Sequence, residues 1–234
     1  MKNNCSTSTP QLITVRDRQT PLTPELLDYI EETFTAEDSF LSDVVDASWY
    51  MEGIPQINIT GWQGNFLQFL VKSINAKNIL EIGTLAGYSA ITMARAAGDN
   101  AHILTIEKER LHYKYALERI AQAGLSDKIE VVNANAREWV KNYKPLQPLD
   151  MIFLDADKSG YWQYVQRLTP HLRSGGLLIM DNAFAFGFLL DTAPERSPEL
   201  AKSMLGFHKK LLGMAEYFTT IVPIGDGMLL SRKT

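Results

Sequence analysis

The sequence predicts an α/β fold, namely a Rossmann-like, doubly wound and mainly parallel seven-stranded sheet with an antiparallel C-terminal hairpin and an N-terminal helical cap. Three observations lead to this prediction. Five short apolar runs alternate with segments of helical period from about residue 77 onward. These runs are nearly continuous in apolar residues, as expected for strands covered on both faces. Two more β-type runs flank a Gly-Asp-Gly turn near the end of the chain.

The first 76 residues are expected to form a tail and a helical cap in the same domain as the core at 77–234. Pro24 and Pro55 are expected to delimit helices in this segment, and a helix is expected from Gly61 to about Ile74.

The core elements then alternate along the chain. Strands are predicted at 78–82, 102–107, 128–132, 149–155 and 176–181. Helices are predicted at 89–97, 109–123, 136–143 and 161–172, with Gly98, Gly124 and Gly175 as stops. A further helix at about 197–217 precedes the β-type runs 218–224 and 228–232. Because crossovers between parallel strands are right-handed, the helices should cover both faces of the sheet.

The composition, cysteine content and net charge narrow the type of protein and the partners that can be expected. The chain has 234 residues, 45% of them hydrophobic and 21% charged, which suits one globular domain. Its single cysteine, Cys5, has no partner for an intrachain disulfide, which favours a reducing compartment. We find no signal peptide and no long apolar run, and the net charge of −4 argues against a phosphate-backbone binder. We therefore expect a cytoplasmic location and neither a nucleic-acid nor a membrane partner.

Polar residues gather where the predicted parallel strands end. They are Glu81 to Ser89, Glu107, Asn133 to Arg137, Asp155 to Lys158, and Asp181-Asn182. In an open parallel sheet, ligands bind beyond the carboxyl ends of the strands, near the reversal of strand order. This convergence predicts one ligand site.

The loop after the first core strand contains Gly83 and Gly87, whose spacing differs from the dinucleotide-binding pattern. Glu81 adds negative charge where a diphosphate would lie, but it suits a ligand with an ammonium or sulfonium group. A structural glycine turn with a solvated glutamate is the alternative. Glu107 ends the next strand, where an acidic side chain can bind ribose hydroxyls. An ordinary surface glutamate is the alternative there.

Asp155, Asp181 and Asn182 offer three hard oxygen ligands, which suit Mg²⁺, Mn²⁺ or Ca²⁺. The alternative is structural: Asp157 caps the next helix, and Asp181-Asn182 form a turn.

Taken together, these motifs resemble the cation-dependent class I O-methyltransferases, the group that includes caffeoyl-CoA and catechol O-methyltransferases. The resemblance runs from about Ile57 to the C-terminus. Its most specific segments are INAKNILEIGTLAGYS at 74–89, LDADK at 154–158, Asp181-Asn182, and VPIGDG at 222–227.

The resemblance implies that residues 77–234 bind S-adenosylmethionine and that the acceptor is a small aromatic diol. It implies a homodimer, a divalent cation held by Asp155, Asp181 and Asn182, and Lys158 as the catalytic base. Asp155 would thus serve the reaction as well as the cofactor. The implied cofactor contacts are Ile59, Glu81, Gly83, Thr84, Ser89, Glu107, Ala136, Asp155 and Asp157.

Two positions depart from the family pattern. Trp62-Gln63 stands where the family usually has acidic residues, and Phe186 stands where plant members often have a substrate-contacting asparagine. Phe184, Phe186 and Phe188 alternate in one loop, where they could either wall the acceptor or pin the loop to the core.

A chemical argument supports the diol. A phenol with a pKa of about 10 is a poor nucleophile at neutral pH, and an ion held by both diol oxygens would lower that pKa and fix the geometry. A neighbouring dication and partial burial would also favour neutral Lys158, and an ordinary surface lysine is the alternative. Three alternatives stay open: a dehydrogenase, a nucleoside-binding protein without catalysis, and a methyltransferase that uses another acceptor or no metal.

Overall fold

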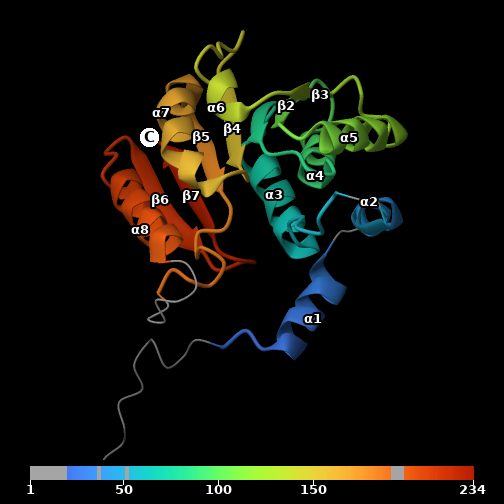
Figure 1. The fold of residues 1–234 in the computed structure, drawn as a ribbon, viewed down its shortest axis with the longest axis horizontal. Helices are drawn as coiled ribbons and strands as arrows, with labels where there is room; N and C mark the ends of the chain where they lie inside the picture. The colour runs from blue at the N-terminus through green and yellow to red at the C-terminus, as the bar shows by residue number, and fades with distance from the viewer. Residues whose placement is uncertain (1–19, 36–37, 51–52, 191–197) are drawn as a thin grey trace, which may run out of the picture.

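The computed structural model describes residues 20–35, 38–50, 53–190 and 198–234. Their strands form one seven-stranded sheet in the order β3-β2-β1-β4-β5-β7-β6 (Figure 1). The first five strands pair in parallel, whereas β7 is antiparallel to both β5 and β6. The predicted fold class is confirmed. The strands are β1 (Asn78–Ile82), β2 (His102–Glu107), β3 (Ile129–Asn133), β4 (Leu149–Leu154), β5 (Leu172–Met180), β6 (Tyr217–Val222) and β7 (Met228–Lys233).

The strand order reverses at β1, which pairs with β2 on one side and β4 on the other. The ends of β1 and β4 are aligned, because Ile82 is paired with Leu154. The Asp155 N–H then donates to the Ile82 carbonyl at 2.9 Å. The loops that follow β1, β2, β4 and β5 therefore emerge at one edge of the sheet, where open α/β folds bind ligands.

Two hydrophobic cores lie on opposite faces of the sheet because side chains alternate along each strand. Ile79 and Met151 belong to one core, together with residues of α2 (Ser39–Tyr50), α3 (Gly61–Ser73), α4 (Tyr88–Ala97) and α5 (Arg110–Gln122). Leu80 and Ile152 belong to the other core, with residues of α7 (Tyr161–Leu168) and α8 (Pro198–Leu212). The short helix α6 (Ala136–Trp139) packs at the edge of this second core.

The N-terminal helices pack unequally. In α2, Leu41 and Val44 are buried in the first core, whereas α1 (Pro24–Phe34) has no buried residue and projects from the body at the bottom of Figure 1. Helix α1 is nevertheless hydrogen-bonded to α3: the Trp62 N–H donates to the Glu31 carboxylate, with its nitrogen 3.2 Å from Oε1 and 3.1 Å from Oε2. That these segments and the core make one domain stays a prediction.

Several predicted boundaries were wrong. The helix predicted at 161–172 ends at Leu168, and Leu172 already starts β5 in register with Leu149 of β4. Gly175 lies inside β5 and does not stop a helix. The helix predicted at 136–143 ends at Trp139, and that predicted to reach Tyr217 ends at Leu212, since Tyr217 pairs with Lys233. Strand pairing determines where these elements end, and the pairing partners cannot be deduced from local periodicity.

The strand predicted at 128–132 begins and ends one residue later. Cys5 and residue 197 lie outside the described residues. Within the described part of the chain, no helix combines the length and apolar character needed to cross a membrane.

Candidate active site

A cavity of about 740 Å³ opens at the carboxyl edge of the sheet, around the reversal of strand order. Its volume lies within the range of small-molecule sites, about 300–1,000 Å³. It is lined by residues 57–59, 82–85, 88–89, 106–109, 112, 134–137, 155–159, 164, 182 and 186. Every strand-end motif identified in the sequence therefore reaches this cavity or lies directly behind it.

Gly83 is required by the close approach of two loops. It has a φ of 98°, and a Cβ at this position would lie 2.0 Å from the Asp155 carbonyl oxygen. Its N–H donates to the Ile106 carbonyl at 3.0 Å. A side chain there would force apart the ends of β1 and β4. Gly83 and Thr84 both line the cavity.

Glu81 lies beneath this turn and does not line the cavity, although a solvated or a cofactor-contacting side chain was expected. It is fully buried, and its carboxyl oxygens accept hydrogen bonds from Ser89 at 2.5 Å and Thr105 at 2.6 Å. Burial raises the pKa of Glu81 to about 8 even though both hydrogen bonds lower it. The charges of Asp155 and Glu107 also contribute to this raised pKa, so Glu81 is mainly neutral at pH 7.

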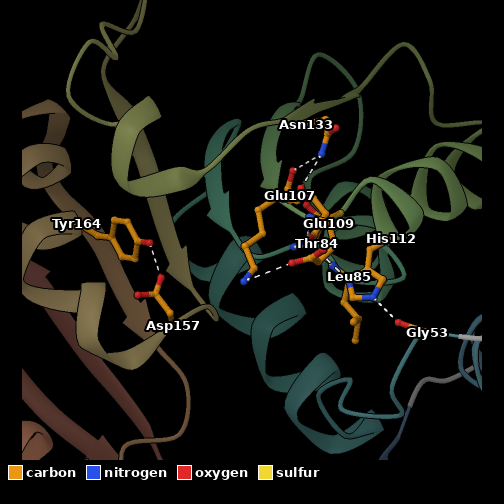
Figure 2. Close-up of polar contacts among 10 residues, drawn as sticks. Gly53, Thr84, Leu85, Glu107, Glu109, His112, Asn133, Asp157 and Tyr164 are labelled. Carbon is orange, nitrogen blue, oxygen red and sulfur yellow. Dashed lines mark hydrogen bonds and ion pairs between the residues drawn. The ribbon is translucent and has the colours of Figure 1, made fainter.

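Glu107 stands at the cavity wall with its carboxylate held by backbone donors (Figure 2). One oxygen accepts the N–H groups of Thr84 at 3.2 Å and Leu85 at 2.9 Å, and the other accepts the Glu109 N–H at 2.8 Å. His112 Nδ1 lies 3.7 Å from the second oxygen. These charge-assisted bonds fasten the glycine-containing loop to the end of β2.

Asp157 is oriented from α7 and α6. Tyr164 donates its hydroxyl to Asp157 Oδ1 at 2.6 Å (Figure 2), and Arg137 donates to Oδ2. Burial, followed by the charge and hydrogen bond of Asp157, raises the pKa of Tyr164, so this phenol remains a donor. Ala136 and Asp157 both line the cavity.

The three predicted oxygen ligands follow the adjacent strands β4 and β5. The Asp181 N–H donates to the Leu154 carbonyl at 3.1 Å, which places Asp181 and Asn182 beside Asp155. Asp181 is buried, and this burial raises its pKa to about 7, with a further contribution from the Asp155 charge. Asp155 and Asn182 line the cavity, whereas Asp181 lies behind its wall.

The donor set consists of two carboxylates and one amide. Accordingly, no group of three or more His, Cys, Asp or Glu side chains suited to a metal occurs among the described residues. All three side chains offer oxygen, however, which is the chemistry that Mg²⁺ and Mn²⁺ prefer. The set fits such an ion as an open site in which substrate and water oxygens complete the coordination.

Lys158 follows β4 and contacts the Tyr161 hydroxyl, which in turn lies close to Asp181, the first residue after β5. Its Nζ lies 3.2 Å from Asp155 Oδ1 and 2.9 Å from the Tyr161 hydroxyl oxygen. That hydroxyl lies 3.0 Å from the Leu154 carbonyl oxygen and 3.2 Å from that of Asp181. The Lys158 side chain is 9% exposed, so it is directed into the site and not into solvent.

In the phenylalanine loop (residues 184–188), the two roles considered above fall to different residues. Phe186 lines the cavity, and its ring centroid lies 5.9 Å from Lys158 Nζ. Phe184 packs on the β6–β7 turn, where a Cβ on Gly227 would lie 2.8 Å from its ring. Asp226 holds the loop by accepting the N–H groups of Phe186 and Gly187 at 2.6 and 3.1 Å.

Of the predicted site residues, Glu81 and Asp181 are buried behind the wall and the others line the cavity. Sequence reasoning did not assign the residues that orient them: Gln63, Arg137, Tyr161, Tyr164 and Asp226. Only Gln63 had a local signal, the Thr-x-x-Gln pattern of a helix capping box at residues 60–63.

Comparisons with known proteins identify the family of the chain. The catechol O-methyltransferase of Niastella koreensis is 34% identical, over 88% of this chain and 92% of that protein. The caffeoyl-CoA O-methyltransferase of Populus kitakamiensis is 31% identical, over 89% and 93%. The O-methyltransferase of Bacillus cereus, solved in complex with SAH, has a TM-score of 0.79 and 29% identity, over 88% of this chain and 96% of that one. A profile of the O-methyltransferase family matches residues 31–234, so the chain is an enzyme that belongs to this family.

Proposed function

We propose that this enzyme transfers the methyl group of S-adenosylmethionine to one hydroxyl of a small catechol-like aromatic and requires a divalent cation, with Mg²⁺ as the first choice. The observation that supports the proposal is that Asp155, Asn182 and Lys158 line the same cavity as Glu107. The names of the relatives above support both the reaction and the acceptor class.

S-adenosylmethionine would lie along the loops after β1, β2 and β3. Glu107 would accept hydrogen bonds from its ribose hydroxyls, in exchange for the backbone donors that the carboxylate now holds. Gly83 and Thr84 would approach it through their backbone, and Asp157, which lines the same cavity, would also contact it. Ile59, Ser89 and Ala136 would complete the contacts.

Asp155, Asp181 and Asn182 would hold the cation. Bound there, a divalent ion would supply Lewis acidity that lowers the pKa of an acceptor hydroxyl. Asp155 would be shared between this role and the hydrogen bond to Lys158.

Lys158 would take the proton of the acceptor hydroxyl at Nζ while the acceptor oxygen attacks the sulfonium methyl group and the thioether leaves. Its amine is held between Asp155 and Tyr161, so proton transfer needs no large movement. Phe186 would cover the acceptor ring on the side of Lys158 and keep water out.

The first experiment measures methyl transfer from labelled S-adenosylmethionine to a panel of catechols such as caffeic acid, with Mg²⁺ and then with excess chelator. Methylation that chelation abolishes supports the proposal. Turnover that survives chelation would remove the metal from it. Bound S-adenosylmethionine without turnover on any catechol would direct the search to another acceptor or to a nucleoside-binding role without catalysis.

A paired substitution tests the base. Lys158→Met should retain the affinity for S-adenosylmethionine and lose about 10²- to 10⁴-fold in turnover. Lys209→Met, at an exposed lysine on α8, is the matched control and should leave turnover unchanged. Normal turnover of Lys158→Met would exclude a role as base.

The homodimer and the cytoplasmic location also stay proposals, and light scattering of the purified protein tests the first.

A further inference from the structure

Gln63 connects the first turn of α3 to the buried carboxylate of Asp181. Its Nε2 donates to Asp181 Oδ1 at 2.9 Å, and its Oε1 accepts the Thr60 N–H at 3.0 Å. Both side chains are almost fully buried, with exposures of 3% for Gln63 and 5% for Asp181. The Thr60 N–H can only donate, so it requires the amide oxygen on its side. The amide NH₂ group must therefore point to Asp181.

The β6–β7 turn holds this amide in place from the other side. A Cβ on Gly225, which has a φ of 56°, would lie 2.6 Å from the Gln63 amide. The same turn fixes the loop after Asp181, because the Gly227 carbonyl accepts the Ala183 N–H at 2.9 Å. The donor and the carboxylate that it meets thus share one rigid support.

Capping alone does not account for the contact. The capping box uses the Gln63 backbone N–H, which donates to Thr60 Oγ1 at 3.2 Å, and the side-chain oxygen Oε1. It makes no use of Nε2. The bond to Asp181 is an additional interaction between residues 118 positions apart in the sequence.

We propose that Gln63 is a positioning residue of the metal site: its amide holds one oxygen of Asp181 so that the carboxylate presents a fixed orientation to a divalent cation. This inference rests on the metal requirement in the proposed function. Carboxylates that bind metals are commonly oriented by a second hydrogen bond, and loss of such a partner typically weakens metal binding by about 10- to 100-fold.

The test compares two substitutions that each remove one half of the same capping box. Gln63→Met keeps the length of the side chain but removes both the back-bond to Thr60 and the donor to Asp181. Thr60→Ala removes the other capping bond and leaves the amide on Asp181. Mn²⁺ affinity is measured by electron paramagnetic resonance, S-adenosylmethionine affinity by calorimetry, and folding by thermal unfolding.

We expect the Mn²⁺ dissociation constant of Gln63→Met to rise about tenfold or more, and that of Thr60→Ala to stay within about twofold of the wild type. The affinity for S-adenosylmethionine should be alike in all three proteins. In turnover assays, Gln63→Met should need more Mg²⁺ for half-maximal activation and recover most of its kcat at saturating Mg²⁺. This separation between metal affinity and kcat is not expected of a merely destabilised protein.

Equal Mn²⁺ affinities for Gln63→Met and Thr60→Ala would overturn the inference and leave Gln63 as a helix cap. A wild type that binds no Mn²⁺ would instead overturn the metal site, and the role of Gln63 with it. If Gln63→Met does not fold, Gly225→Ala displaces the amide without removing it and should weaken Mn²⁺ binding in the same direction. Wild-type affinity in Gly225→Ala would then count against the inference.

Discussion

Replacing Glu81 by glutamine should stabilise the protein at neutral and alkaline pH, and the gain should grow as the pH rises. The side chain is fully buried and accepts hydrogen bonds from Ser89 and Thr105. Glutamine has the shape of the neutral acid. The Thr105 hydroxyl also lies 2.5 Å from that of Thr84, so it can turn its proton there and accept from the new amide.

The magnitude follows from the pKa, which burial raises from 4.5 to about 8 in the folded protein. Between these values the unfolded chain has lost a proton that the folded chain keeps, so the stability of the wild type falls as the pH rises. Each pH unit costs about 1.4 kcal/mol, which gives a cost on the order of 3 kcal/mol at pH 7. Glutamine does not titrate and escapes this cost.

The assay is urea unfolding of the wild type and Glu81→Gln from pH 5 to 9, without cofactor and with chelator present. The stability difference should widen in favour of Glu81→Gln up to about pH 8 and then level off. Glu32→Gln, at an exposed glutamate of α1, should show no such trend. A difference that does not change with pH would show that Glu81 is ionised in the folded protein and refute the reasoning.

Three further substitutions test how the site is supported. Gly83→Ala places a Cβ 2.0 Å from a backbone carbonyl oxygen at a φ of 98°, so we expect little folded protein in thermal unfolding, and a wild-type melting curve would contradict this. Asp150 has a lowered pKa because hydrogen bonds, the first from Arg173, outweigh its burial. Asp150→Ala should therefore lose about 2 kcal/mol or more at pH 7 in urea unfolding, and the loss should shrink as the pH falls through the range in which Asp150 takes up a proton. Tyr164→Phe removes the hydroxyl that orients Asp157 and should weaken S-adenosylmethionine binding about 5- to 10-fold in calorimetry, whereas unchanged affinity would show that this bond does not position Asp157.

Local patterns were sufficient for the order and type of the core elements but not for their ends. Strands β1 and β2 match their predicted bounds, because each is a short, apolar-rich run between helical segments. Leu172 and Tyr217 were predicted as helical and start strands, because their backbone groups pair with partners far away in the sequence. A local pattern contains no information about such partners.

The same division holds at the candidate site. The sequence alone determined the family, the parallel core and the carboxyl-edge location, because strand-end motifs must converge once the strands are parallel. Only the tertiary structure decided that Glu81 is buried beneath the turn and that Gln63 meets Asp181 across 118 positions. Burial and long-range hydrogen bonds depend on which chain segments pack together, and this packing changes the pKa of a glutamate and the orientation of a carboxylate without any change in the local sequence.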